Sequence, residues 1–302
     1  MGQIPLSTGS RASVQLDRAA VWRLTFEGLR NTLRLYGVVL ATFLYSLTGG
    51  MLVVLATGRA EQIAWKFLQL MGSAVFAIAC LLVLWPMVSD EAVNGWVMRL
   101  GVLLALASAT VIVLAPFAET ASKAFRVVCG LGGLVGLSAG CVSVAALVGP
   151  SFGTPFFTAG LIIGQALSGI LLGSITITWL LGHAYLTATR MTIAPLGHFS
   201  RILLWAVAVR GGFLLLSIAV AWMTSNNAGP PILARIADAW IVVLLRVGVG
   251  LVAVGVFALM VRACVRLRAT QSATGILYFG SLFAYIGELA NQHLVIAWAW
   301  PM

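Results

Sequence analysis

The chain has 302 residues, of which 61% are hydrophobic and only 9% are charged. An ordinary soluble domain is excluded, because soluble proteins carry about 25% charged residues. The formal net charge is +10, but Lys and Arg are scattered over short connections and helix ends, so we expect the lipid bilayer as a partner and not nucleic acid.

Long apolar runs recur along the chain and predict an all-α integral membrane protein of about eight transmembrane helices, since about 20 apolar residues cross the hydrocarbon core as a helix. We expect residues 1–31 to form a polar tail and an amphipathic helix that lies in the membrane interface. Residues 32–302 then form a single transmembrane domain, which divides naturally into two four-helix halves. The predicted helices are 32–57, 67–86, 96–117, 127–148, 156–186, 202–223, 239–265 and 275–298.

The distribution of basic residues predicts the orientation of these helices. Most Lys and Arg outside the first 34 residues lie in the connections that follow odd-numbered helices. Such connections are typical of the cytoplasmic side. We therefore expect these connections to face the cytoplasm, although this places the amino terminus, with Arg11, Arg18, Arg23, Arg30 and Arg34, on the opposite side. We also expect a multi-pass protein of the bacterial cytoplasmic (inner) membrane.

Charged residues well inside the predicted helices, away from their ends, occur only in the carboxy-terminal half, as Arg210, Arg246 and Glu288. Each costs at least about 2.5 to 3.5 kcal/mol in hydrocarbon, so such residues usually face a partner or a wet cavity. Arg246 and Glu288 share a depth and are predicted to form an ion pair. Arg210 is then left without an acidic partner. A bound anion, backbone carbonyls or snorkelling would each serve it.

Polar side chains recur at helical spacing on two of the predicted helices. On the fifth helix they are Gln165, Thr176, His183 and Thr187. On the eighth they are Tyr278, Tyr285 and Glu288. Two such stripes, together with the two buried arginines, predict a cavity or a bound polar group between helices five to eight. Hydrogen bonding between helices, at about 0.6 kcal/mol per contact, explains the stripes equally well.

The chain has three histidines, and His183 and His198 flank the connection between the fifth and sixth predicted helices. A haem with two histidine ligands, or a copper site, would have to use this pair, with Met191 as a further candidate ligand. Their spacing matches no established metal motif. Histidines at the interface more often form hydrogen bonds only.

No Walker A sequence, HExxH, catalytic triad or glycine-rich dinucleotide fingerprint is present, which disfavours hydrolytic and nucleotide-driven chemistry. The leading hypothesis is therefore a membrane subunit of a redox complex, with other subunits as partners. It would handle a quinone or haem b among helices five to eight, with His183 and Tyr185 near the head group and Arg210 as anion partner. A transporter of protons or a small anionic solute is the alternative. A structural or assembly subunit is the third.

Overall fold

The computed structural model describes the backbone of residues 18–89, 95–148, 155–187, 192–225 and 232–298. These residues are helical with short connections and no strand. Eight stretches are long and apolar enough to cross a membrane. The prediction of an all-α, multi-pass membrane protein is therefore confirmed.

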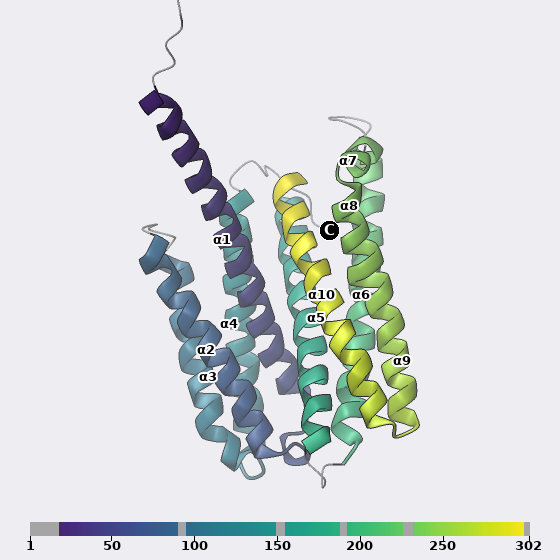
Figure 1. The fold of residues 1–302 in the computed structure, drawn as a ribbon. Helices are drawn as coiled ribbons and strands as arrows, with labels where there is room; N and C mark the ends of the chain where they lie inside the picture. The colour runs from purple at the N-terminus through teal and green to yellow at the C-terminus, as the bar shows by residue number, and fades with distance from the viewer. Residues whose placement is uncertain (1–17, 90–94, 149–154, 188–191, 226–231, 299–302) are drawn as a thin grey trace, which may run out of the picture. The chain divides into compact units, whose positions relative to one another are not determined.

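The helices follow one another along the chain with short connections between them (Figure 1). They are α1 (Arg18–Thr57), α2 (Trp65–Ser89), α3 (Gly95–Leu114), α4 (Ser122–Val148), α5 (Pro155–Thr187), α6 (Ala194–Ser225), α7 (Ile232–Asp238), α8 (Trp240–Leu244), α9 (Val254–Arg266) and α10 (Thr270–Trp298). A π-helical segment, Leu245–Ala253, joins α8 to α9. Together these three pieces make the seventh span, Trp240–Arg266.

The chain divides into two compact units, Met1–Gly37 and Val38–Met302, and the packing described below belongs to the second. The predicted amphipathic segment falls mainly in the first unit. Residues 1–17 and the side chains of residues 18–35 lie outside the described part of the chain. The position of the amphipathic segment in the membrane interface therefore stays a prediction.

Four helices, α1, α4, α6 and α10, begin at least five residues earlier than the apolar runs predict. The sixth starts at Ala194 and not near residue 202, with Pro195 in its first turn, where a missing backbone N–H costs nothing. Leu196 and Phe199 of this added segment are fully buried. The eighth predicted helix is α10, which starts at Thr270 and not near residue 275, so residues 270–274, which the apolar run leaves in a connection, lie within a helix.

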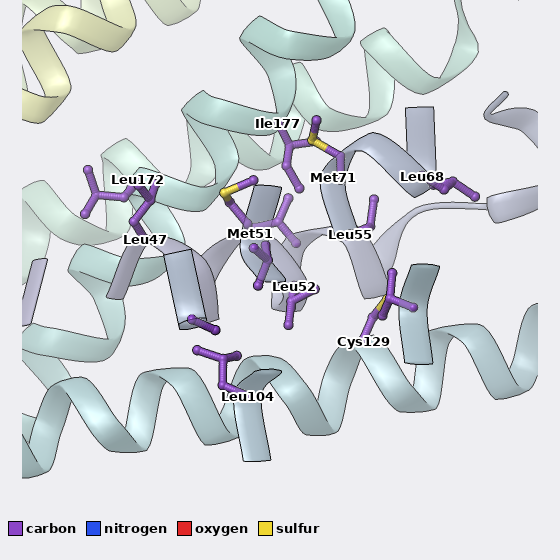
Figure 2. Packing of buried hydrophobic residues seen from close by; sticks show 14 of the residues in the cluster. Leu47, Met51, Leu52, Leu55, Leu68, Met71, Leu104, Cys129, Leu172 and Ile177 are labelled. Carbon is purple, nitrogen blue, oxygen red and sulfur yellow. The ribbon is translucent and has the colours of Figure 1, made fainter. Parts of the chain in front are cut away.

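Two hydrophobic clusters hold the spans together, and α5 contributes to both. The first cluster joins α5 to α1, α2, α3 and α4; the second joins it to α6, α9 and α10. Every residue from Leu171 to Thr178 of α5 is buried. Figure 2 shows part of the first cluster, including Leu47, Met51, Leu52, Leu55, Leu68, Met71, Leu104, Cys129, Leu172 and Ile177.

Glycines allow α1 to approach α5 at backbone distance. A Cβ atom on Gly50 would lie 1.7 Å from the carbonyl oxygen of Gly169, and one on Gly173 would lie 2.1 Å from the carbonyl carbon of Gly50. No larger residue fits at either place without a backbone shift. Small residues are the usual means of such close helix packing in membranes, where van der Waals contact replaces the hydrophobic effect.

Candidate functional site

Three charged side chains from three different spans meet in the interior, and all three are fully buried. Arg246 Nη1 donates a hydrogen bond to Glu288 Oε1 at 2.6 Å. The predicted Arg246–Glu288 pair is confirmed. Arg210 Nε lies 3.7 Å from the same oxygen, so the expectation that Arg210 has no acidic partner at its depth is wrong. Helix α6 packs against α9 and α5, and this packing brings Arg210 to the same carboxylate. The depths of the residues along their own helices do not reveal which helices are neighbours.

Two uncharged polar residues complete this charged cluster, which we define as Ser168, Arg210, Arg246, Glu288 and Asn291. Arg210 Nη2 donates to Ser168 Oγ at 3.0 Å. Asn291 Nδ2 lies 3.3 Å from Glu288 Oε2 and 3.4 Å from Ser168 Oγ. The sequence interpretation missed Ser168 and Asn291. The signal was available, because Asn291 follows Glu288 by three residues and therefore shares its helix face.

The backbone around Arg246 and Glu288 is unusual in two respects. Arg246 belongs to the π-helical segment, and such segments are rare and often lie at functional sites. One turn later, Gly250 meets Gly287 of α10, and a Cβ atom on Gly287 would lie 2.1 Å from Gly250 Cα. Gly287 immediately precedes Glu288. This backbone contact therefore fixes the seventh span against α10 at the level of the ion pair.

Arg246 uses only part of its hydrogen-bonding capacity. Among the residues that the structure describes, its Nε and Nη2 atoms are buried and have no hydrogen-bond partner, and the same is true of Asn291 Oδ1. Nearly all buried polar groups in proteins are paired with protein, ligand or water. The N–H groups of Nε and Nη2 point in parallel from one edge of the guanidinium. That edge matches the two oxygens of a carboxylate or phosphate.

Polar pairs lie on both sides of the charged cluster along α5 and α10, which pack side by side (Figure 1). The pairs are Gln292 Nε2 to Gln165 Oε1 at 3.0 Å, Thr176 Oγ1 with Tyr285 OH at 2.8 Å, and Tyr278 OH with His183 Nδ1 at 2.8 Å. We call this series the α5–α10 polar seam. His183 is exposed and lies about 27 Å along the helix from Gln165 at 1.5 Å per residue. The seam thus covers most of the hydrocarbon thickness.

The amino-terminal half also contributes to the seam. Gln165 Nε2 donates to Ser46 Oγ of α1 at 2.5 Å, and Ser46 Oγ in turn donates to the carbonyl oxygen of Thr42 at 2.9 Å. Gly140 of α4 leaves room for this contact, since a Cβ atom there would lie 2.8 Å from Ser46 Oγ. The Gln165 end of the seam is therefore fixed between three spans.

Three other predicted site residues are placed differently. Tyr185 OH donates to the carbonyl oxygen of Thr192. His198 Nε2 pairs with Thr57 Oγ1 of α1 at 3.4 Å, whereas His183 pairs with α10. The side chain of Thr187 lies outside the described residues. In the described ranges no group of three or more His, Cys, Asp or Glu side chains could hold a metal ion.

The site combines two guanidinium groups with one carboxylate, and Glu288 is the only acidic residue within the eight spans. Two cationic groups against one carboxylate leave a net positive charge, which favours an anion. Searches against known protein families, curated proteins and solved structures found no match to this chain, so its function must be argued from the site itself.

Proposed function

We propose that this chain is a membrane carrier for a small organic anion, with Arg246 as the main anion-binding residue. The observation that carries the proposal is the buried guanidinium edge of Arg246, whose Nε and Nη2 have no hydrogen-bond partner among the described residues. A carboxylate that bound this edge would satisfy both donors at once. Glu288 would remain on Nη1.

The energetics favour a bound anion at this place. An ionised group in hydrocarbon is retained only at considerable cost, and such groups usually mark substrate or ion pathways. Unsatisfied hydrogen-bonding groups add about 1 to 3 kcal/mol each. A ligand carboxylate offsets both costs. Because Arg246 is fully buried in this structure, entry of the ligand requires that the spans around it move, as in carriers that alternate access to a central site.

The α5–α10 polar seam supports transport over static binding. From the charged cluster as far as His183, whose side chain is exposed, it offers hydroxyl and imidazole groups to a polar solute. On the other side of the cluster it offers the amides of Gln165 and Gln292. Polar linings that connect a central site with one end of the bundle are the usual form of a transport pathway.

The test is saturable binding and uptake of small monocarboxylates at pH 7. The purified full chain is reconstituted in proteoliposomes and given acetate, propionate or lactate, each radiolabelled. We expect uptake with the wild-type chain and its loss, by at least about tenfold, in Arg246→Gln, since removal of a charged hydrogen-bond partner costs about 1.5 to 3 kcal/mol. Thr110→Val is the control, because the Thr110 hydroxyl donates its hydrogen bond to the carbonyl oxygen of Leu106 in its own helix.

Two results would overturn the carrier proposal. One is the absence of binding and uptake for all three anions in folded wild-type protein, which would favour a structural or assembly role. The other is uptake that Arg246→Gln leaves unchanged. Loss of uptake in Thr110→Val to the same degree would show that the reconstitution and not the site is being measured.

A redox role is the second candidate function, favoured by the end of the seam near His183. Tyr278 is partly exposed and contacts both His183 and the ring of Trp179, at 5.4 Å between Trp179 and Tyr278 centroids. In the described chain Trp179 Nε1 is buried without a hydrogen-bond partner. These groups suit the carbonyl oxygens of a quinone. Extraction of bound quinone and the visible spectrum of the purified protein test this candidate. A haem Soret band in that spectrum would support His183 and His198 as haem ligands.

A further inference from the structure

The geometry points to a substrate that carries a hydrogen-bond donor next to its carboxylate, as 2-hydroxy and 2-amino acids do, with Asn291 as the residue that selects for it. This inference rests on the proposed carrier function. It concerns the amide oxygen of Asn291, a group of the charged cluster that has no role in the anion binding by Arg246 proposed above. That oxygen is buried and has no hydrogen-bond partner among the described residues.

The orientation of the Asn291 amide follows from its neighbours. The amide nitrogen lies 3.3 Å from Glu288 Oε2 and 3.4 Å from Ser168 Oγ. A carboxylate accepts hydrogen bonds and does not donate them, so the NH2 group has to face Glu288. The reversed amide would set two acceptors against each other. Asn291 Oδ1 is therefore turned away from Glu288 and needs a donor from elsewhere.

Arg246 and Asn291 are held on the two oxygens of one carboxylate. Arg246 Nη1 bonds Glu288 Oε1, and Asn291 Nδ2 bonds Glu288 Oε2. The free edge of Arg246 and the free oxygen of Asn291 thus belong to two side chains that meet at one carboxylate, and the proposed substrate would contact both. Its carboxylate would accept from Arg246 Nε and Nη2. A hydroxyl or ammonium group on the adjacent carbon would donate to Asn291 Oδ1.

Hydrogen-bond selection of this kind is strong. A site built around a ligand hydroxyl or amine rejects the analogue that lacks it, because the buried protein acceptor is then left unsatisfied. We expect the wild-type chain to bind lactate about 10- to 100-fold more tightly than propionate. The two anions share a carboxylate, a charge and a three-carbon chain, and differ only in the 2-hydroxyl group.

The experiment measures equilibrium binding of lactate, propionate and alanine to the full chain in nanodiscs at pH 7. Alanine distinguishes an ammonium from a hydroxyl donor. Asn291→Leu removes the amide acceptor at similar size, so we expect the preference for lactate over propionate to fall to about twofold or less. Ser281→Ala is the matched control on α10, since the buried Ser281 hydroxyl contacts the carbonyl oxygen of Tyr278 in its own helix. It should keep the wild-type preference.

The outcomes separate this inference from the carrier proposal. If wild type binds lactate and propionate equally, and Arg246→Gln abolishes both, the carrier proposal holds and the role of Asn291 is refuted. If neither anion nor alanine binds, both are refuted. Because the wild-type ratio needs no substitution, the inference is tested even if Asn291→Leu does not fold. A preference that persists in folded Asn291→Leu also refutes it.

Discussion

Gly287→Ala tests how the backbone places the ion pair. Gly287 lies in α10 beside Glu288, and its nearest neighbour across the interface is the backbone of Gly250, not the flexible end of a side chain. An added Cβ atom would lie 2.1 Å from Gly250 Cα. No rotamer change relieves this clash, so the seventh span and α10 must separate.

The size of the separation follows from the same distances. Ordinary van der Waals contact begins at 3.4 Å, against 2.1 Å here, so the backbones have to move apart by about 1.3 Å. If Arg246 and Glu288 follow their helices, their 2.6 Å contact lengthens to about 3.9 Å, beyond hydrogen-bond distance. Overpacking costs about 1 to 3 kcal/mol, and loss of a charged hydrogen bond about 1.5 to 3 kcal/mol.

The assay is thermal unfolding of purified protein together with lactate affinity. We expect Gly287→Ala to lower the free energy of unfolding by about 3 to 5 kcal/mol, and to weaken binding because Arg246 is displaced. Gly275→Ala is the control in the same helix, since no atom lies within 4 Å of its added Cβ. Alanine has the higher helix propensity, so the control should be neutral or slightly stabilising.

If Gly287→Ala unfolds at the same temperature as Gly275→Ala and binds lactate as wild type does, the predicted separation of the seventh span from α10 is contradicted. The seventh span and α10 would then not be in backbone contact, and the position of Arg246 beside Glu288 would need another explanation. Instability with unchanged affinity per folded molecule would show that the glycine contact stabilises the bundle without positioning the site.

Two further predictions concern the same spans. Glu288→Gln and Arg246→Gln should each cost about 3 to 5 kcal/mol of stability, and the double variant less than the sum, because the Arg246–Glu288 contact can be lost only once; additive losses by chemical denaturation would contradict the pairing. Tyr285→Phe, which removes the 2.8 Å contact with Thr176, should slow lactate uptake severalfold while equilibrium binding stays unchanged. Equal loss of uptake and binding, or the same loss in Thr110→Val, would contradict a role in the pathway.

The fold was largely predictable because lipid leaves the backbone few alternatives. Solid apolar runs longer than about 20 residues have to be helices, and eight such spans are found. Helix starts were harder to predict. Pro195 and Gly275 are typical of connections, but the surrounding residues pack in the interior, and tertiary packing outweighs such local preferences.

The site was predictable in part. Depth alone paired Arg246 with Glu288 correctly, since unpaired charges are costly in hydrocarbon. The contact between Arg210 and Glu288 depends on which helices are neighbours, and spacing along one chain does not reveal that. The π-helical segment has no recognisable sequence signal here. It was therefore missed, although it carries Arg246.

Helix α5 belongs to both hydrophobic clusters, and its two sides differ in how firmly they hold their neighbours. Toward α1 it is locked by the backbone contacts of Gly50 with Gly169 and Gly173, whereas toward α6, α9 and α10 it presents side chains such as Leu171 and Ile175. Interlocked backbones resist sliding, while side-chain layers shear more readily. We expect α5 to stay in place relative to α1 while α10 slides along it, so that the polar pairs between α5 and α10 break and re-form with each change of conformation.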